Sequence, residues 1–392
     1  MLSATPVKTT SLRRPALAAV AALLFAATAQ AADLSETKLV ASDAAKRDLF
    51  GWSAAMSATT AIVGAPWKDN KQGAVYLYDT TTGAQTAKLT ASDAADNRQF
   101  GNSVAISGTT AIIGAKGEDS SVTLPGAVYL FDTETGRQTA KLMPEDGTSK
   151  DLIITSVGVS GSTAIVGALV DVVGTAFLFD IVTGDRTAKL TASDVVAGDL
   201  FGGVVAISGA TAIVGASWKD NSTGAAYLFD TKTGKEIAKL TASDAAEQQY
   251  FGSAVAISGT TAIVGAFANE DHGPQTGAAY LFDTTTGKQI AKLTAGNAAQ
   301  GDMFGFSVAI AGSTAIVGAN QTALDKGAKP GEAFLFDATT GAEITRLTAS
   351  DGAADDRFGN AVAISETAVI VGANGSDGSG DASGSAYLFR RH

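Results

Sequence analysis

The sequence contains no cysteine, two histidines and seven prolines among 392 residues. The absence of cysteine excludes disulfides, thiolate metal ligands and a cysteine nucleophile. His272 and His392 leave little material for a histidine-rich metal site or a serine–histidine triad. Charged residues are scarce at 17%, and the net charge of −11 argues against a nucleic-acid partner, because phosphate binding needs a cationic surface. Glycine is plentiful at 44 residues, and a hydrophobic content of 45% is too high for a disordered chain.

The first 31 residues are predicted to be a secretory signal peptide. Residues 8–14 hold three basic side chains, residues 16–29 are apolar, and Ala29-Gln30-Ala31 is a small-x-small cleavage site. The apolar run is too short for a membrane span. We therefore expect cleavage after Ala31 and a secreted, periplasmic or cell-surface location. Loss of three basic and no acidic residues would take the charge from −11 to −14.

One pattern recurs seven times: Lys-Leu-Thr-Ala-Ser-Asp, then Phe-Gly, then Thr-Ala-Ile-Val-Gly-Ala, then Tyr-Leu-Phe-Asp and Thr-Gly. The phenylalanine always lies seven residues after the acidic mark and fourteen before the glycine of Gly-Ala. Length varies only between Gly-Ala and Tyr-Leu-Phe, which indicates an exposed loop. The Phe-Gly phenylalanines are Phe50, Phe100, Phe201, Phe251, Phe304 and Phe358, with Ile153-Ile154 in the third repeat.

Each repeat is predicted to form four short strands. In the second repeat they cover residues 103–107, 110–114, 127–131 and 139–143, separated by Gly, Asp, Ser and Thr turns that leave no room for helices. Nearly continuous apolar strands are typical of sheets covered on both faces, as in radially stacked blades. We therefore predict an all-β fold, a seven-bladed β-propeller of four-stranded antiparallel blades, as a single domain over residues 32–392.

The two ends of the repeat region predict how the ring closes. The last repeat stops after its third strand at residues 387–389, whereas residues 37–40 form a fourth strand with no repeat before it. Pairing of these two strands would close the ring and leave no open edge. Deletion of residues 33–41 is expected to open the ring.

Phe-Gly followed fourteen residues later by Gly-Ala resembles the FG-GAP repeat, the blade unit of the integrin α-subunit propeller, over residues 38–389. The resemblance implies a seven-bladed propeller of a bacterial secreted type with a role in ligand binding or adhesion, and it supplies no catalytic residues. The calcium sites of that family use an Asp-rich loop between the first and second strands. Here Ser57-Ala58-Thr59 and its equivalents contain no aspartate. We therefore expect no cofactor and do not carry calcium binding over to these loops.

The repeated acidic marks are predicted to be structural, with each side chain capping a turn that every blade needs. The alternative is an acidic ligand surface on one face of the ring. The phenylalanines are predicted to be packing wedges. The repeated aspartates are Asp43, Asp93, Asp194, Asp244 and Asp351.

The variable loops hold the candidate ligand-binding residues. Trp67-Lys68-Asp69-Asn70 recurs as Trp218-Lys219-Asp220-Asn221. An exposed tryptophan beside Asp and Asn can stack on a sugar or anchor a protein partner, and the alternative is that each tryptophan covers its own blade. Alternate connections emerge on opposite faces, so these loops are expected to share an acidic face with the fourth-to-first connections. Asp119 and Asp271 add acid to these loops, and Asp377 and Asp381 are candidate calcium ligands in a loop that could instead be solvated.

We predict a non-enzymatic, monomeric binding or adhesion protein that recognises a protein or glycan through the variable loops, with no membrane span. The alternatives are a propeller enzyme, a quinoprotein-like protein or an envelope-assembly protein. Residues 280–288 are similar to the blade repeat of quinoprotein dehydrogenases. However, Ile237 and Ala238 stand where those blades carry a docking tryptophan.

Overall fold

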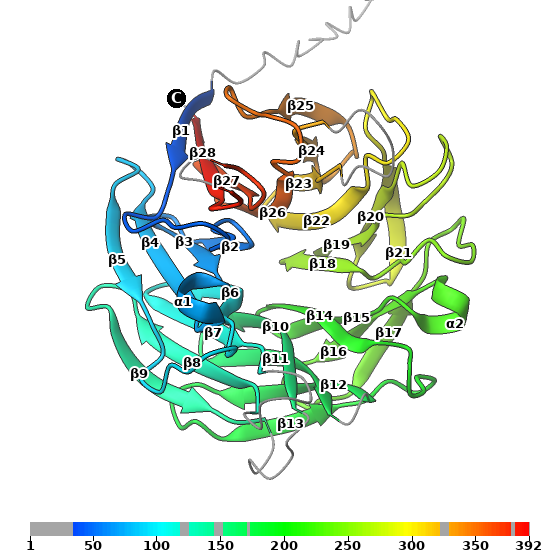
Figure 1. Cartoon of the computed structure of the whole chain (residues 1–392). Helices are drawn as coiled ribbons and strands as arrows, with labels where there is room; N and C mark the ends of the chain where they lie inside the picture. Colours follow the sequence, from blue (N-terminus) through cyan, green and yellow to red (C-terminus); the bar gives the residue numbers. More distant parts are fainter. Residues whose placement is uncertain are drawn as a thin grey trace, which may run out of the picture. The chain divides into compact units, whose positions relative to one another are not determined.

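The structure, a computed structural model, describes residues 34–117, 125–144, 152–170, 173–321, 329–377 and 381–391. In these ranges, strands β1–β28 form seven four-stranded antiparallel sheets, which Figure 1 shows as blades arranged around one axis. The all-β seven-bladed propeller is confirmed. Residues 1–31, the predicted signal peptide, lie outside the described residues.

Blades 1 to 7 follow the chain, and each runs from the axis outward. Blade 1 is β2 (Ser53–Met56), β3 (Thr60–Ala65), β4 (Ala74–Asp79) and β5 (Gln85–Leu89); blade 2 is β6 (Phe100–Ser107), β7 (Thr110–Ala115), β8 (Ala127–Asp132) and β9 (Arg137–Leu142); blade 3 is β10 (Ile153–Ser160), β11 (Thr163–Val170), β12 (Val173–Asp180) and β13 (Arg186–Leu190); blade 4 is β14 (Phe201–Ser208), β15 (Thr211–Ala216), β16 (Ala225–Asp230) and β17 (Glu236–Leu240). Blade 5 is β18 (Ala254–Ser258), β19 (Thr261–Ala266), β20 (Ala278–Asp283) and β21 (Lys288–Leu293); blade 6 is β22 (Phe304–Ala311), β23 (Thr314–Ala319), β24 (Glu332–Asp337) and β25 (Glu343–Leu347); blade 7 is β26 (Phe358–Ile364), β27 (Ala368–Ala373), β28 (Ser385–Arg391) and β1 (Leu34–Leu39).

The predicted closure of the ring is confirmed in blade 7. Strand β1 pairs antiparallel with β28 in a register that runs from Leu34 opposite Arg391 to Leu39 opposite Ala386. In Figure 1 the blue first strand lies beside the red last one. The Arg390 guanidinium adds two hydrogen bonds, to the Thr37 hydroxyl at 2.9 Å and to the Thr80 carbonyl of blade 1 at 2.7 Å. The seam of the ring, where β1 pairs with β28, is therefore held by both backbone and side-chain hydrogen bonds.

The hydrophobic core lies between blades, because apolar side chains on both faces of each strand meet the neighbouring sheet. Ile62 and Val75 of blade 1 pack in one cluster with Phe100 and Tyr129 of blade 2. Phe100 is fully buried and meets the Tyr129 ring edge to face, with centroids 5.5 Å apart. Equivalent pairs recur in blades 1, 4, 5 and 6, which confirms the phenylalanines as packing wedges.

Two glycines allow neighbouring blades to approach at backbone distance. A Cβ on Gly64 of blade 1 would lie 2.2 Å from the carbonyl oxygen of Gly101 in blade 2, and Gly101 itself has a φ of +87°. A side chain at either position would force the blades apart. The Gly of Gly-Ala therefore faces the Gly of Phe-Gly across each such interface.

Blade 3 is built differently at this position. Ile154 pairs with Ala168, as Phe100 pairs with Ala115 in blade 2. In blade 2 two unpaired residues separate Phe100 from the next paired residue, whereas in blade 3 one unpaired residue follows Ile154. The register therefore places Ile154, rather than Ile153, at the phenylalanine position and removes the following glycine. Gly114 of blade 2 accordingly meets the Ile154 side chain in place of a glycine carbonyl.

Candidate functional site

The two Trp-Lys-Asp-Asn loops fold into the same unusual turn. The four-residue segments α1 (Lys68–Lys71) and α2 (Lys219–Ser222) contain left-handed residues, with φ of 51° at Asp69 and 50° at Asp220. Three consecutive residues adopt this region in each turn. A left-handed conformation costs an ordinary L-residue roughly 1–2 kcal/mol, so the surroundings must hold both turns in place.

Backbone carbonyls of each turn hold the next blade. The carbonyl of Asn70 accepts the N–H of Asn97 at 3.2 Å, and that of Lys71 accepts the N–H of Gln99 at 2.7 Å. In the second turn, Asn221 and Ser222 accept the N–H groups of Gln248 and Tyr250 at 3.1 and 2.8 Å. The turns are therefore clamps between blades, a role that the indel-tolerant appearance of these loops concealed. Their repeated sequence was the signal that could have revealed it.

Both loop lysines lie beneath the surface. Lys68 is 5% exposed, and its ammonium group donates to the Asp43 carbonyl and, at 3.0 Å, to the Asp48 carboxylate. Lys219 donates to the Asp194 carbonyl at 2.6 Å and the Asp199 carboxylate at 3.4 Å. Burial lowers the pKa of Lys219, but the surrounding carboxylates outweigh it and raise that pKa overall. These ammonium groups hold the turns, so they are not part of the exposed ligand surface that the sequence suggested.

The repeated aspartates are structural, but their partners differ from the expected turn amides. Asp194 accepts the Tyr227 hydroxyl at 2.6 Å and the Lys239 ammonium at 2.7 Å. Partial burial alone would raise the pKa of Asp194, but these hydrogen bonds outweigh it and lower the pKa to about 2. The same Tyr–Asp–Lys triad joins Tyr76, Asp43 and Lys88; Tyr129, Asp93 and Lys141; Tyr280, Asp244 and Lys292; and Tyr387, Asp351 and Lys38.

A different set of aspartates caps turns. Asp79 Oδ1 accepts the N–H groups of Thr81 and Thr82 at 3.0 and 2.7 Å. These hydrogen bonds lower the pKa of Asp79. Between the first and second strands, Ser57 Oγ accepts the N–H of Thr60, and no carboxylate stands in that turn. This donor set does not fit a calcium ion.

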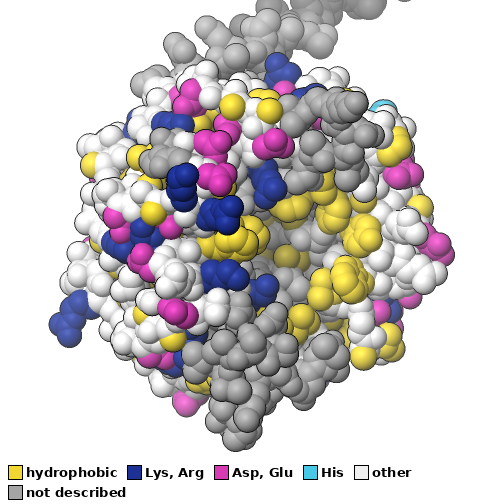
Figure 2. Space-filling model, viewed as in Figure 1, with side chains coloured by type: hydrophobic (Ala, Val, Ile, Leu, Met, Phe, Trp, Pro, Cys, Tyr) yellow, Lys and Arg dark blue, Asp and Glu magenta, His cyan; other side chains and the backbone are white. Residues whose placement is uncertain are grey.

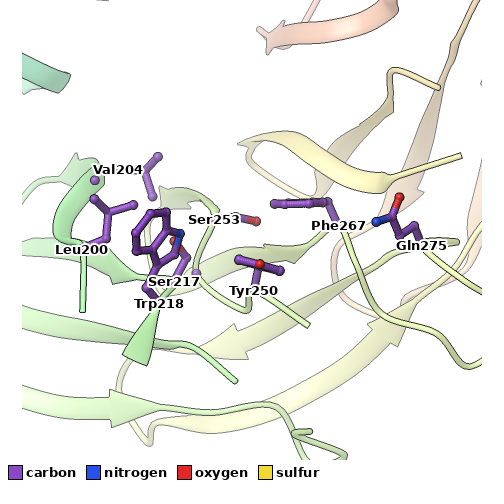
Figure 3. Close-up of a pocket in the computed structure, with 10 residues that line it drawn as sticks. Leu200, Val204, Ser217, Trp218, Tyr250, Ser253, Phe267 and Gln275 are labelled. Carbon is purple, nitrogen blue, oxygen red and sulfur yellow. The ribbon is translucent and has the colours of Figure 1, made fainter. Parts of the chain in front are cut away.

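A neutral pocket opens between blades 4 and 5, shown in Figure 3. Its volume is about 440 Å³. Trp218, 56% exposed, stands on the blade 4 side, and Tyr250 stacks on Phe267 on the blade 5 side with ring centroids 5.2 Å apart. None of the described residues that line it is charged; its walls are Leu200, Gly203, Val204, Ser217, Trp218, Tyr250, Gly252, Ser253, Phe267 and Gln275.

A charged pocket of about 610 Å³ opens between blades 7 and 1. Trp67 lines it, 40% exposed, as the equivalent of Trp218. Arg47 lies 3.6 Å from Asp381, and the Asp377 carboxylate accepts the N–H of Ala382 at 2.7 Å. Figure 2 shows the resulting division of this face: hydrophobic side chains gather to the right of the centre, and Lys, Arg, Asp and Glu side chains lie above and to the left.

The remaining candidate acids are not brought to these pockets as a group. Asp271 pairs with Lys292, and Asp69 and Asp220 are exposed on the clamp turns. Asp119 lies outside the described residues. Among the residues that the structure describes, no group of three or more His, Cys, Asp or Glu side chains could hold a metal ion. No helix in the described part of the chain is long and apolar enough to cross a bilayer.

The structure is a seven-bladed β-propeller with open pockets between blades 4 and 5 and between blades 7 and 1. The FG-GAP repeat family matches the chain seven times, and the chain belongs to that family. The matched residues are 34–78, 84–131, 137–179, 185–229, 235–282, 288–336 and 342–389. A comparison with curated proteins found no match.

Proposed function

We propose that this protein is a non-enzymatic binding or adhesion module that acts outside the cytoplasm and recognises a protein or glycan through the face that carries α1 and α2. The observation that carries the proposal is the presence of two open pockets on one face, each beside an exposed tryptophan. Exposed aromatic side chains beside polar groups supply much of the binding energy at recognition surfaces.

The use of the acidic residues supports binding over catalysis. Catalytic carboxylates need unpaired lone pairs directed at a substrate. Here Asp43 and Asp194 are engaged by tyrosine and lysine, and Asp79 is engaged by its own turn. The pockets offer aromatic rings and, in the charged pocket, three aspartates and two arginines, groups that can hold a partner without any chemical step.

A combined array of glycans and surface proteins tests the proposal. The secreted form, without the expected signal peptide, is applied beside two single variants, Trp67→Ala and Trp218→Ala. We expect at least one ligand whose binding falls about tenfold or more in one of the variants. Binding that neither substitution changes would remove this face from the proposal. Matched thermal melting curves show whether a loss of binding comes from unfolding. Because Trp67 and Trp218 are 40% and 56% exposed, we expect these curves to change little.

A further inference from the structure

The walls of the neutral pocket are held in place before any ligand arrives. Tyr250 has a φ of 56°, and its N–H donates to the Ser222 carbonyl at 2.8 Å. Gln275 has a φ of 53°, and its carbonyl accepts the N–H of Met303 at 3.0 Å. Phe267 is fixed between Tyr250 and Phe306, whose centroid is 6.0 Å away. A fixed wall loses little conformational entropy on binding, which favours affinity.

The aromatic rings offer a stacking surface of limited size. Figure 3 shows Trp218 across the pocket from the Tyr250–Phe267 pair, with Ser253 between them. The volume of about 440 Å³ lies within the range of roughly 300–1,000 Å³ that small-molecule sites have. The space therefore suits a compact ring or a short run of rings.

Three polar side chains of the pocket lack partners in the described part of the chain, whereas the Ser253 hydroxyl donates to the Gly265 carbonyl at 3.4 Å. The hydroxyls of Ser217 and Tyr250 and the side-chain amide of Gln275 make no hydrogen bond to described residues. Tyr250 is unusual in this respect. The hydroxyls of the other six tyrosines are hydrogen-bonded: Tyr76, Tyr78, Tyr129, Tyr227, Tyr280 and Tyr387.

The chemistry of these walls selects among ligands. A charged ligand would lose its hydration without meeting a counter-charge from the described walls, because none of the residues known to line the pocket is charged. A purely apolar ligand would cover the Tyr250, Ser217 and Gln275 polar groups and leave them unpaired, at a cost of about 1–3 kcal/mol for each group buried. A neutral sugar ring avoids both costs, since its C–H face packs on aromatic rings and its hydroxyls pair with hydroxyl and amide groups.

We propose that the neutral pocket between blades 4 and 5 binds a neutral sugar residue of a glycan. The ring stacks against Trp218 and the Tyr250–Phe267 pair, and its hydroxyls bond to Tyr250, Ser217 and Gln275. This inference rests on the proposed binding function and names the ligand class for one of its two pockets.

The test uses the full secreted form on an array of neutral mono- and oligosaccharides with sialylated and sulfated counterparts, followed by titration of the best neutral probe. We expect Trp218→Ala to weaken binding about tenfold or more and Tyr250→Phe, which removes only the hydroxyl, to weaken it severalfold. Trp67→Ala alters the same position of the same turn beside the charged pocket, so it compares the two pockets and should weaken the neutral probe far less than Trp218→Ala does. Val182→Ala, at an exposed position that lines neither pocket, is the control and should leave neutral-sugar binding unchanged.

Three results would overturn the inference: no neutral probe binds, only charged probes bind, or Trp67→Ala and Trp218→Ala weaken the neutral probe equally. Parallel binding to surface proteins separates this failure from that of the proposed function. If proteins bind while neutral sugars do not, the sugar assignment fails and the binding function stands. If neither binds, both fail.

Discussion

The turns α1 and α2 differ little in conformation and greatly in surroundings. Trp67 and Trp218 precede them with φ of −98° and −97°, and Lys68 and Lys219 are equally buried. Yet the described walls of the pocket beside Trp67 include two arginines and three aspartates, whereas those of the pocket beside Trp218 carry no charge. Most of the difference comes from the neighbouring blade, which is blade 7 beside Trp67 and blade 5 beside Trp218. Arg47 adds one charge from the segment that leads into blade 1. A repeat protein can therefore conserve a loop for its structural role and vary the recognition surface through the neighbouring blade.

The largest expected effect comes from opening the ring, which should disturb the charged pocket beside the seam more than the distant neutral pocket. Deletion of residues 33–41 removes β1, which closes blade 7, and blade 7 forms one wall of the charged pocket. We expect the thermal midpoint to fall by more than about 10 °C. The deletion should also increase acrylamide quenching of tryptophan fluorescence near the charged pocket more than near the neutral one. Trp52 and Trp67 are followed in a Trp218→Phe protein, and Trp218 is followed in a Trp52→Phe/Trp67→Phe protein. An unchanged melting curve would refute closure by β1.

The next effect tests whether the two turns share one scaffold. Lys68→Met and Lys219→Met each leave a buried aspartate, Asp48 or Asp199, without its cation. Breaking a buried ion pair costs about 3–5 kcal/mol, so both variants should unfold at clearly lower urea concentration and to a similar extent. Lys46→Met, on the exposed surface, is the control and should change little. A large loss in only one turn would show that the scaffolds are not equivalent.

A smaller effect probes the left-handed residues themselves. Asn70→Val and Asn221→Val place a β-branched side chain at φ of 56° and 58°. We expect each to lower the free energy of unfolding by about 1–2 kcal/mol, because branching at Cβ is poorly tolerated in this region. Asn70→Gly and Asn221→Gly are the matched controls and should be close to neutral in chemical denaturation. Neutral valine variants would contradict the left-handed geometry.

The smallest effect is on the pH dependence of stability, and it should be shared by the two repeats that carry these turns. Hydrogen bonds from Lys239 and Tyr227 outweigh burial and lower the pKa of Asp194 to about 2, below an unfolded value of about 3.9. The carboxylate therefore stabilises the fold fully above the unfolded pKa, and this contribution disappears as the pH falls through the folded value. Its side chain is 43% exposed, so solvent screening keeps the effect modest.

Urea unfolding at pH 5, 3 and 2 measures how much the Asp194 carboxylate contributes to stability. The stability gap between the wild type and Asp194→Asn should shrink as the pH falls, and the gap for Asp43→Asn should shrink in parallel, because the pKa of Asp43 is also lowered. A gap that stays constant down to pH 2 would show that the triads do not stabilise the fold through their charge.

The strand pattern was predictable because it repeats at fixed spacing. Phe100, Gly114 and Tyr129 each serve a local geometry that recurs in most blades, so their spacing predicted the ring. The missing fourth strand of the last repeat predicted how the ring closes. The third repeat was misread by one residue, because spacing alone aligns Ile153 with the phenylalanines and a deleted glycine is not visible without the strand register.

The pockets were less predictable because their walls come from different repeats. Trp218 was identified from its repeated loop, but Tyr250 and Phe267 belong to the next blade and break no motif. Only the fold shows that they stack on each other and face Trp218. Likewise, burial of Lys68 depends on Asp48, twenty residues earlier in the chain, at a position no motif had marked.

Closure of the ring by β1 also constrains when the fold can be completed. The hydrogen bond between Arg390 and Thr37 joins residues 353 positions apart. Blades 1 to 6 need only neighbouring segments, but the seventh cannot form until the last strand has been synthesised. Contacts of such long sequence separation slow folding, and an unpaired edge strand is prone to associate with other chains. Folding is therefore expected to proceed blade by blade and to end with a slow closing step that a linear array of the same repeats would not need.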